Sequence, residues 1–265
     1  MANRNKSNFV RLKQIIQIIE PRFPRVLQKT TEYLIRDQVK SYSLYGEDAI
    51  VQGMLKRYSY KFNRKLDLSY IDIGAWRPIK NSNTYFLYKQ GYSGTAVEPN
   101  KHFENLWKSV RSRDKFVLAA CGNQTESTYY KFHSAGQSNT LSLEFAKSLA
   151  SSQRISYDSS EKVECLRLEQ IIQIHKSNFT GDFLLDIDIE GSDLSAIETF
   201  NFIKPLRPMI IIVEDFLSFN VSFYDSKLVA FLTTKDYYLV ARSGPSSIFI
   251  DATTDLVGLF DKDNL

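Results

Sequence analysis

From residue 68 onward, the sequence alternates short apolar runs with longer stretches of mixed polarity, and this alternation restricts the possible folds more than any other feature. The apolar runs have the length of strands, and the stretches at 83–90 and 101–110 have the length of helices. Such alternation is typical of a parallel sheet covered by helices on both faces. The strand candidates are residues 68–73, 94–98, 116–120, 183–188, 209–213, 237–240 and 247–250.

The last two strand candidates are joined only by residues 241–246. This connection is too short for a helical crossover, so we expect these strands to pair antiparallel. The sequence therefore predicts an α/β fold with a doubly wound sheet and an antiparallel strand at its C-terminal end. Residues 122–179 form a long insertion between the third and fourth strands, where we expect contacts with substrate.

The first 40 residues differ from the rest in charge. They hold nine Lys or Arg residues against three acidic ones, a balance of +6, although the whole chain carries only +4. Apolar residues recur at helical spacing before and after Pro21 and Pro24, so we predict a basic helical appendage over 1–40 and one α/β domain over 41–265. The appendage is interpreted as a solvated helix face, as a peripheral contact to an anionic partner, or as a surface for a homo-oligomer.

Composition limits where such a chain functions. No uncharged apolar stretch approaches the roughly 18 residues that a membrane helix needs, and the N-terminus lacks the apolar region of a signal peptide. The only cysteines, Cys121 and Cys165, are too few for a disulfide framework, and we expect two buried free thiols. These features favour a cytoplasmic protein.

The first motif with chemical content is the strand 70–73 that runs into Gly74 and Ala75. In a doubly wound sheet, ligands bind beyond the carboxyl ends of the strands, and a glycine in the first turn lets the backbone approach the ligand. Asp72 and Gly74 are therefore candidates for binding a nucleotide-like cofactor, although Asp-x-Gly is also a common turn. Trp76 and Arg77 stand where a dinucleotide fingerprint needs further glycines, which disfavours a dinucleotide.

The second motif is Glu98, followed by Pro99, at the end of the next strand, 26 residues after Asp72. A carboxylate at this position can accept hydrogen bonds from both hydroxyls of a ribose. The alternative is an acidic residue that stabilises the N-terminus of the helix at 101–110.

The third motif is a group of carboxylates at two neighbouring strand ends. Asp186, Asp188 and Glu190 alternate along one strand, and Glu214 and Asp215 end the next. Like charges so close together require compensation by a divalent cation, by raised pKa values or by a cationic substrate. Some of them are equally explained as residues that begin the following helices.

Histidines offer a further candidate for a general base. His133 lies in the insertion beside a polar loop and is a candidate base, whereas His102 and His175 are expected on helix surfaces. No Gly-x-Ser-x-Gly elbow and no Gly-Lys-Ser or Gly-Lys-Thr loop supports a hydrolase or nucleotidase.

Taken together and in this order, the motifs over residues 41–216 resemble those of FkbM-type methyltransferases. The matching segments are residues 43–48, 70–75, 82–85, 87–94, 97–100 and 187–191. The resemblance implies a class I, Rossmann-like methyltransferase that uses S-adenosylmethionine to methylate a hydroxyl group, most often on a sugar of a polysaccharide, a glycolipid or a glycosylated small molecule.

The resemblance also implies roles for single residues. The cofactor would contact Asp72, Gly74 and Ala75 at its methionine part, Asn83 and Thr84 nearby, Glu98 and Pro99 at its ribose, and Ala120 and Cys121 at its adenine edge. A similarity to macrocin-type sugar O-methyltransferases implies a Mg²⁺ ion held by Asp188, Glu214 and Asp215. Asp188 and Glu190 would then be catalytic, and Glu190 would take the proton of the acceptor. Trp76, Arg77 and Cys121 depart from the pattern of the family.

Two other functions remain open from sequence alone. A nucleic-acid methyltransferase would use the basic N-terminal arm, although the core lacks a basic stripe interleaved with aromatic residues. A non-catalytic binding module would keep the fold, with Trp76 filling the cofactor cleft.

Overall fold

The structure, a computed structural model, describes residues 39–132, 136–153, 159–215 and 225–260. Apart from Val39 and Lys40, the basic appendage predicted for residues 1–40 lies outside these ranges, as does His133. The sheet and its helices belong to the unit Ser41–Leu265. Within the described ranges, no helix combines the length and the apolar character needed to cross a membrane.

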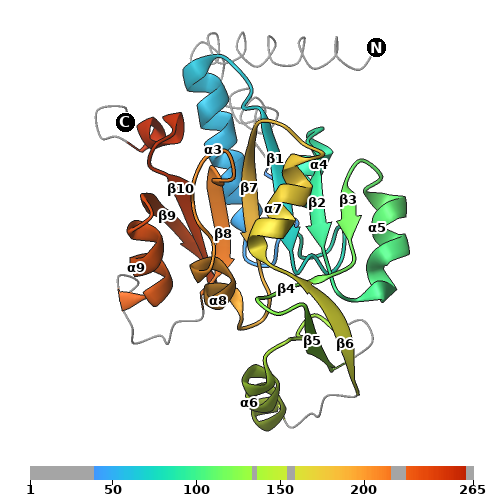
Figure 1. The fold of residues 1–265 in the computed structure, drawn as a ribbon. Coiled ribbons are helices and arrows are strands. Elements are labelled where there is room, and N and C mark those ends of the chain that lie inside the picture. The colour runs from blue at the N-terminus through green and yellow to red at the C-terminus, as the bar shows by residue number, and fades with distance from the viewer. Residues whose placement is uncertain (1–38, 133–135, 154–158, 216–224, 261–265) are drawn as a thin grey trace, which may run out of the picture. The chain divides into compact units, whose positions relative to one another are not determined.

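The centre of the fold is a mostly parallel sheet of seven strands in the order β3-β2-β1-β7-β8-β10-β9 (Figure 1). These strands are β1 (Leu68–Ile73), β2 (Gly94–Val97), β3 (Lys115–Val117), β7 (Asp182–Ile187), β8 (Ile210–Glu214), β9 (Tyr237–Ser243) and β10 (Ser246–Asp251). Neighbours from β3 to β8 pair parallel, whereas β10 is antiparallel to both β8 and β9. The predicted antiparallel pairing of the last two strands is confirmed.

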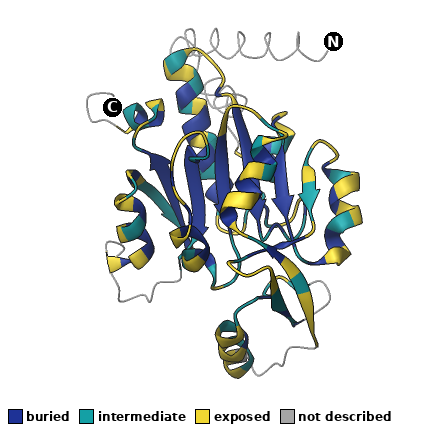
Figure 2. Cartoon of the chain, viewed as in Figure 1, coloured by how far each residue is buried: buried dark blue, intermediate teal, exposed yellow. Residues whose placement is uncertain are grey.

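Helices pack against both faces of this sheet. The first face is covered by α3 (Glu47–Phe62), α4 (Tyr85–Lys89) and the 3-10 helix η4 (Asp255–Leu259). The second is covered by α7 (Leu168–Lys176), α8 (Asp193–Glu198) and α9 (Lys227–Thr233), and α7 crosses in front of the sheet in Figure 1. Figure 2 shows the central strands buried along most of their length between these layers.

The continuous apolar runs of the sequence follow from this double cover. Along β7, Phe183, Leu185 and Ile187 belong to the core cluster under α7, α8 and α9, whereas Leu184 belongs to the cluster under α3 and α4. A strand buried on both faces carries a nearly continuous apolar run rather than apolar residues at alternate positions, and Asp186 near the end of β7 interrupts the run where the strand reaches the site.

Near the β3 edge, the predicted helix at 101–110 is divided into the 3-10 helix η2 (Lys101–Phe103) and α5 (Glu104–Val110). Phe103 and Trp107 from these helices pack against Ala75 and Ala96 at the ends of β1 and β2. This small cluster lies beside the C-terminal ends of the strands.

The prediction of one strand over 116–120 is wrong. β3 ends at Val117, and Ala120 starts a second sheet, in which β4 (Ala120–Cys121) pairs parallel with β6 (Ser159–Leu166) and β6 pairs antiparallel with β5 (Glu126–Lys131). This sheet and α6 (Leu143–Gln153) form most of the insertion, whereas its last helix, α7, belongs to the main layer.

The surface position expected for His175 is also wrong. His175 has no exposed surface, because its helix presents it to the core, and its ring nitrogens hydrogen-bond to Ser69 Oγ at 2.8 Å and to Thr95 Oγ1 at 3.0 Å. Burial lowers the pKa of His175 to about 3. His102 is exposed as expected, and both cysteines are buried free thiols as expected.

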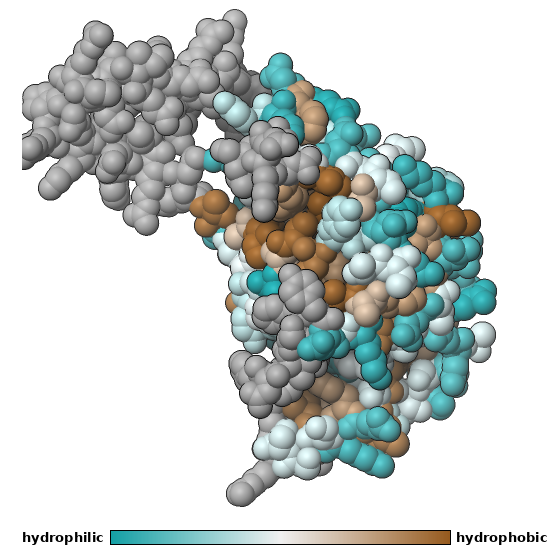
Figure 3. All heavy atoms as spheres, turned by 90° about the vertical axis from the view of Figure 1, so that its left-hand side faces the viewer, coloured by the Kyte–Doolittle hydropathy of each residue, from teal (hydrophilic) through white to brown (hydrophobic). Residues whose placement is uncertain are grey.

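The outer strand β9 leaves an apolar edge. Tyr238 is exposed and Leu239, Val240 and Ala241 are half-buried. Figure 3, which faces this side of the molecule, shows hydrophobic side chains gathered in the middle of the face.

Candidate functional site

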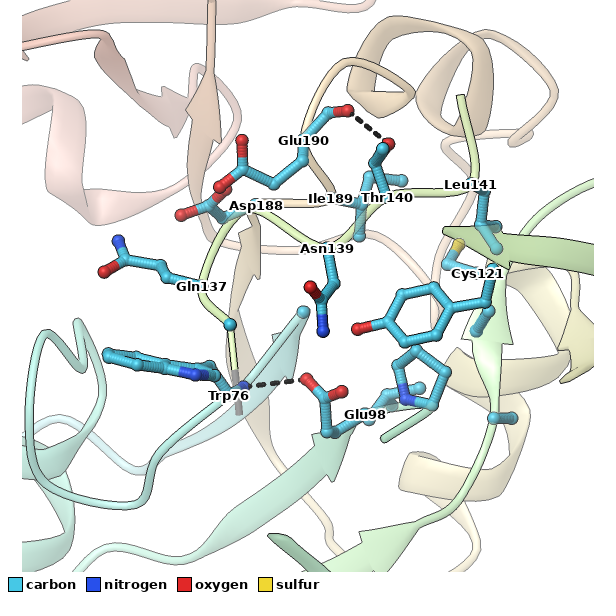
Figure 4. A pocket seen from close by; sticks show the side chains of 17 residues that line it. Trp76, Glu98, Cys121, Gln137, Asn139, Thr140, Leu141, Asp188, Ile189 and Glu190 are labelled. Atoms are coloured by element: carbon cyan, nitrogen blue, oxygen red, sulfur yellow. Dashed lines mark hydrogen bonds between the residues drawn. The ribbon is translucent and has the colours of Figure 1, made fainter. Parts of the chain in front are cut away.

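The C-terminal ends of β1, β2, β7 and β8 lie together at one edge of the sheet, because these strands are parallel and adjacent. Three adjoining cavities open there, and we name each after one residue that lines it. The Glu98 pocket is lined by the ends of β1 and β2 and by the insertion (Figure 4). The Asp72 pocket lies beside it, and the Glu214 pocket lies toward α3 and α6. All three share Gln137, Asp188 and Glu190.

Most of the predicted cofactor residues line these cavities. Gly74, Glu98, Pro99, Ala120 and Cys121 line the Glu98 pocket. The Asp72 pocket is lined by Asp72, Gly74, Ala75 and Asn83. Thr84 lines none of the three, since it is buried beneath them and donates a hydrogen bond from Oγ1 to the Asp72 carboxylate.

Gly74 brings two strand ends into direct backbone contact. Its φ of +80° lies in the left-handed region, and a Cβ atom there would lie 1.8 Å from the carbonyl oxygen of Asp188. The Gly74 N–H donates to the Val97 carbonyl at 3.0 Å, which ties the same turn to β2. Only glycine permits this conformation together with this close approach.

Glu98 is buried at the end of β2, with 4% of its surface exposed. Its Oε2 accepts the N–H of Trp76 at 2.9 Å, and its Oε1 accepts the N–H of Asn100 at 2.7 Å. Burial raises the pKa of Glu98 to about 7, although these two backbone donors favour the ionised form. Tyr129 also hydrogen-bonds to this carboxylate, and because two carboxylate oxygens offer about four acceptor sites, the group keeps the capacity to accept a bond from a ligand.

Trp76 forms part of the wall of the Glu98 pocket. Its φ is +39°, and its carbonyl accepts a hydrogen bond from Trp107 Nε1 at 2.9 Å. The indole packs on the cluster of Phe103 and Trp107, and in Figure 4 it lies to one side of the Glu98 carboxylate. Trp76 therefore borders the cavity, and the cavity beside Glu98 stays open.

Two aspartates face each other beneath the Asp72 pocket. Asp72 on β1 is in register with Asp186 on β7, and burial raises the pKa of both carboxyl groups. Thr84 donates to Asp72, and Asn83 Nδ2 donates to Asp186 Oδ1 at 3.1 Å. The loop before α4 therefore supplies a donor to each of the two aspartates.

A buried arginine supports this arrangement. Arg111 is fully buried, with its Nη1 atom 4.0 Å from Asp72 Oδ2 and its Nη2 atom donating to Thr84 Oγ1 at 3.0 Å. Its Nε donates to Asp114 Oδ2 at 2.6 Å, and its guanidinium lies 4.3 Å from the centre of the Trp107 ring. Sequence analysis missed Arg111, because nothing in its local sequence distinguishes it from an exposed arginine.

Asp188, Glu190 and Glu214 form the acidic boundary between the Glu98 and Glu214 pockets. In Figure 4 the carboxyl groups of Asp188 and Glu190 point to the same side. Glu190 has a φ of +53°, and its carbonyl accepts a hydrogen bond from Thr140 Oγ1 at 2.8 Å.

The environment of these three acids favours their neutral forms. Burial, followed by the repulsion of neighbouring acids, raises the pKa of Glu190 to about 8 and that of Glu214 to about 10. Burial raises the pKa of Asp188 to about 6, and its carboxyl shares a hydrogen bond with Glu214. Apart from this shared hydrogen bond, the buried oxygens Asp188 Oδ1 and Glu214 Oε2 receive no donor from the described residues.

Of the three residues predicted to hold Mg²⁺, the structure brings only Asp188 and Glu214 together. Asp215 accepts a hydrogen bond from Ser226 Oγ at 2.7 Å and forms an ion pair with Arg242 at 3.3 Å, so its charge is already compensated away from Asp188. In the part of the chain that the structure describes, no three His, Cys, Asp or Glu side chains form a group that could hold a metal ion. These residues do not fit the predicted magnesium site.

The insertion contributes residues that sequence analysis did not identify individually. Tyr129, Asn139, Thr140 and Leu141 line the Glu98 pocket, and the last three are seen above the Glu98 carboxylate in Figure 4. The polar composition of residues 134–140 was the one signal for Asn139 and Thr140, and it indicated a region rather than particular side chains.

The mostly parallel sheet has a close backbone approach at the end of β1, a buried carboxylate at the end of β2 and a cavity beyond both, which is where α/β proteins of this class hold their ligands. Residues 72–239 match the family model described as the methyltransferase FkbM domain. This match covers more than half of the chain, which therefore belongs to the FkbM methyltransferase family. Comparisons with curated proteins and with solved structures gave no match.

Proposed function

We propose that this methyltransferase uses S-adenosylmethionine to methylate a hydroxyl group of a sugar. The observation that carries the proposal is the continuity of the site: the pocket that contains Glu98 shares Asp188 and Glu190 with the Glu214 pocket on the other side. A cofactor in the first pocket and an acceptor in the second would meet at these two acids. The chain adds β2 and β3 on one side of β1, and then adds β7 and β8 on its other side. This change of side, at a point where the paired strands β1 and β7 are parallel, supports the class I, Rossmann-like arrangement.

The residues that line the Glu98 and Asp72 pockets offer suitable chemical groups to the parts of such a cofactor. Glu98 would accept hydrogen bonds from the two ribose hydroxyls, and Ala120 and Cys121 would border the adenine. Gly74 provides the close backbone approach, and Asp72 and Asn83 line the adjoining cavity that would receive the methionine part. The cofactor supplies a methyl group bonded to a positively charged sulfur, which the acids nearby would also stabilise.

The chain itself must orient the acceptor hydroxyl and take its proton. Glu190 is placed for this task, because it lines both the cofactor and the acceptor cavities. Its pKa of about 8, raised by burial, is close to the value that suits a general base near neutral pH. The reaction proposed here uses no metal ion, since Asp215 is held by Arg242.

The test is a calorimetric titration with S-adenosylhomocysteine, the demethylated product, on the wild type, on Glu98→Ala and on Glu198→Ala. Hydrogen bonds to a charged group contribute about 1.5–3 kcal/mol each, so loss of Glu98 should weaken binding at least about tenfold. Glu198 is exposed on α8 and lines none of the three pockets, so its variant should bind like the wild type. Absence of binding to the wild-type protein would refute the proposal and favour a non-catalytic binding module.

A further inference from the structure

The Glu214 pocket has a wall that indicates the chemistry of its ligand. It lies on the side of Asp188 and Glu190 opposite the Glu98 pocket, between α3, α6 and the start of β10. On the proposed function it would receive the acceptor. Four carboxyl groups line it, from Glu47, Asp188, Glu190 and Glu214. Among the described residues that line this cavity, none is Lys, Arg or His.

No basic side chain among the described residues that line this wall compensates its acids, so the compensation comes from the protons that the raised pKa values of Glu190 and Glu214 retain. Glu47 is buried, and its oxygens accept hydrogen bonds from Ser246 Oγ at 3.0 Å and from the Tyr45 N–H at 3.0 Å, both neutral donors. Asp188 and Glu214 share a hydrogen bond with each other, and Asp188 Oδ1 and Glu214 Oε2 receive no hydrogen bond from any other group in the described part of the chain. An unsatisfied buried acceptor destabilises a structure, and the loss is recovered when a ligand supplies the donor.

An ammonium group supplies what the acids of this wall lack among the described residues, namely further hydrogen-bond donors and positive charge. Its three N–H donors can replace the proton that Asp188 and Glu214 share and serve both carboxyl groups, and its positive charge offsets the repulsion among the acids. An anionic ligand, such as a phosphorylated or carboxylated sugar, would instead add to that repulsion.

The rest of the wall suits a sugar ring. Tyr45 and Phe145 present aromatic surface, and Tyr45 is 54% exposed. Asn81, Asn83 and Gln137 present amide groups that can both donate to and accept from hydroxyls. Aromatic faces also attract cations, so the same wall accommodates a ring that bears an ammonium group.

We propose that the acceptor of this enzyme is an amine-bearing sugar or polyol, whose protonated amine binds between Asp188 and Glu214 while the hydroxyl to be methylated faces Glu190. The inference rests on the proposed function, and it narrows the acceptor from sugars in general to cationic ones.

The test compares three probes that differ in charge but share a ring: methyl glycosides of glucosamine, of N-acetylglucosamine and of glucuronic acid. Each is titrated into the wild-type protein saturated with S-adenosylhomocysteine and followed by ligand-observed NMR. The amine should bind at least tenfold more tightly than its N-acetylated form, which removes the charge and keeps the ring, and the acid should bind most weakly.

Two variants locate the effect. Glu214→Gln should reduce the preference for the amine at least tenfold, whereas Glu198→Gln, which changes an exposed acid outside the pocket, should leave it unchanged. Retained binding of S-adenosylhomocysteine shows that a variant is folded. If Glu214→Gln does not fold, Glu190→Gln tests the same wall.

The outcomes separate the two proposals. If the protein binds S-adenosylhomocysteine but shows no preference for the amine, or no detectable binding of the amine, this inference is overturned and the proposed function remains intact. If S-adenosylhomocysteine does not bind, the proposed function is refuted. The three probes are then compared on the free protein, and absence of the preference for the amine there overturns this inference as well.

Discussion

Replacement of Gly74 by alanine tests how closely the ends of β1 and β7 must approach to build the site. The added Cβ would lie 1.8 Å from the Asp188 carbonyl oxygen and 2.8 Å from its carbonyl carbon. Both atoms belong to the backbone, so no side-chain rotation can relieve the overlap, and the strand ends must separate by more than about 1 Å.

The expected loss of stability in Gly74→Ala has two parts. A left-handed conformation destabilises a residue with a side chain by about 1–2 kcal/mol, and forced overpacking adds about 1–3 kcal/mol. We therefore expect Gly74→Ala to lower the free energy of unfolding by about 2–5 kcal/mol, a large share of the roughly 5–15 kcal/mol typical of a folded domain. Because Asp188 itself moves, affinity for S-adenosylhomocysteine should fall as well.

Two other glycines separate these contributions in urea denaturation. Gly91 has a φ of +93° with nothing within 4 Å of its Cβ position, so Gly91→Ala should lose only the conformational part, about 1–2 kcal/mol. Gly53 lies exposed inside α3 with open space around it, and Gly53→Ala should stabilise the protein by up to about 1 kcal/mol. If Gly74→Ala is no more destabilising than Gly91→Ala, the result contradicts the close approach of the ends of β1 and β7.

Three more predictions concern charge. Because burial raises the pKa of Glu98 to about 7 and ribose binding requires the carboxylate, affinity for S-adenosylhomocysteine should fall about tenfold per pH unit below 7, a dependence that Glu98→Gln should abolish. The folded protein retains the proton of the Glu98 carboxyl to a higher pH than the unfolded chain does. Glu98 therefore contributes stability that is present below its ordinary pKa of 4.5 and is lost as the pH rises toward 7. Chemical denaturation of the wild type and of Glu98→Gln across this pH range measures that contribution. Arg111→Met leaves Asp72 and Asp114 buried without their cation, and urea denaturation should show a loss of about 3–5 kcal/mol, whereas a loss under 1 kcal/mol would contradict the supporting role of Arg111. Dialysis against a chelator should change neither the thermal midpoint nor the affinity for S-adenosylhomocysteine, and an increase of either on adding Mg²⁺ would contradict the metal-free site.

The sequence predicted the main sheet well, because strands buried on both faces leave continuous apolar runs. It failed where a strand changes partners. Residues 116–120 read as one apolar run, yet β3 ends at Val117 and Ala120 pairs with β6 in another sheet. Hydrophobicity gives the length of an extended segment but does not identify its partner. β6 is mostly exposed and polar, so it has no apolar pattern by which to detect it.

The acids at the strand ends could be predicted because parallel strands bring their C-terminal ends together. The predicted role of Glu214 and Asp215 as joint metal ligands finds no support, because Asp215 pairs with Ser226 and Arg242, which are distant in sequence. His175, in contrast, was predictable as a buried residue. It lies four residues after Ile171 on one helix, so the buried face of α7 includes it. Arg111 and Tyr129 reach the site through tertiary packing alone, for which one sequence gives no signal.

The position of β7 beside β1 has a consequence for how the chain is synthesised. β1, β2 and β3 are complete by Val117, yet the strand that covers the other edge of β1 begins only at Asp182, about 110 residues after β1 ends. At about 5–20 residues per second, the ribosome needs about 5–20 s to make that interval. During this time the nascent chain exposes an apolar strand edge of the kind that pairs with other chains. We expect this enzyme to depend on chaperones during translation more than its size alone would suggest.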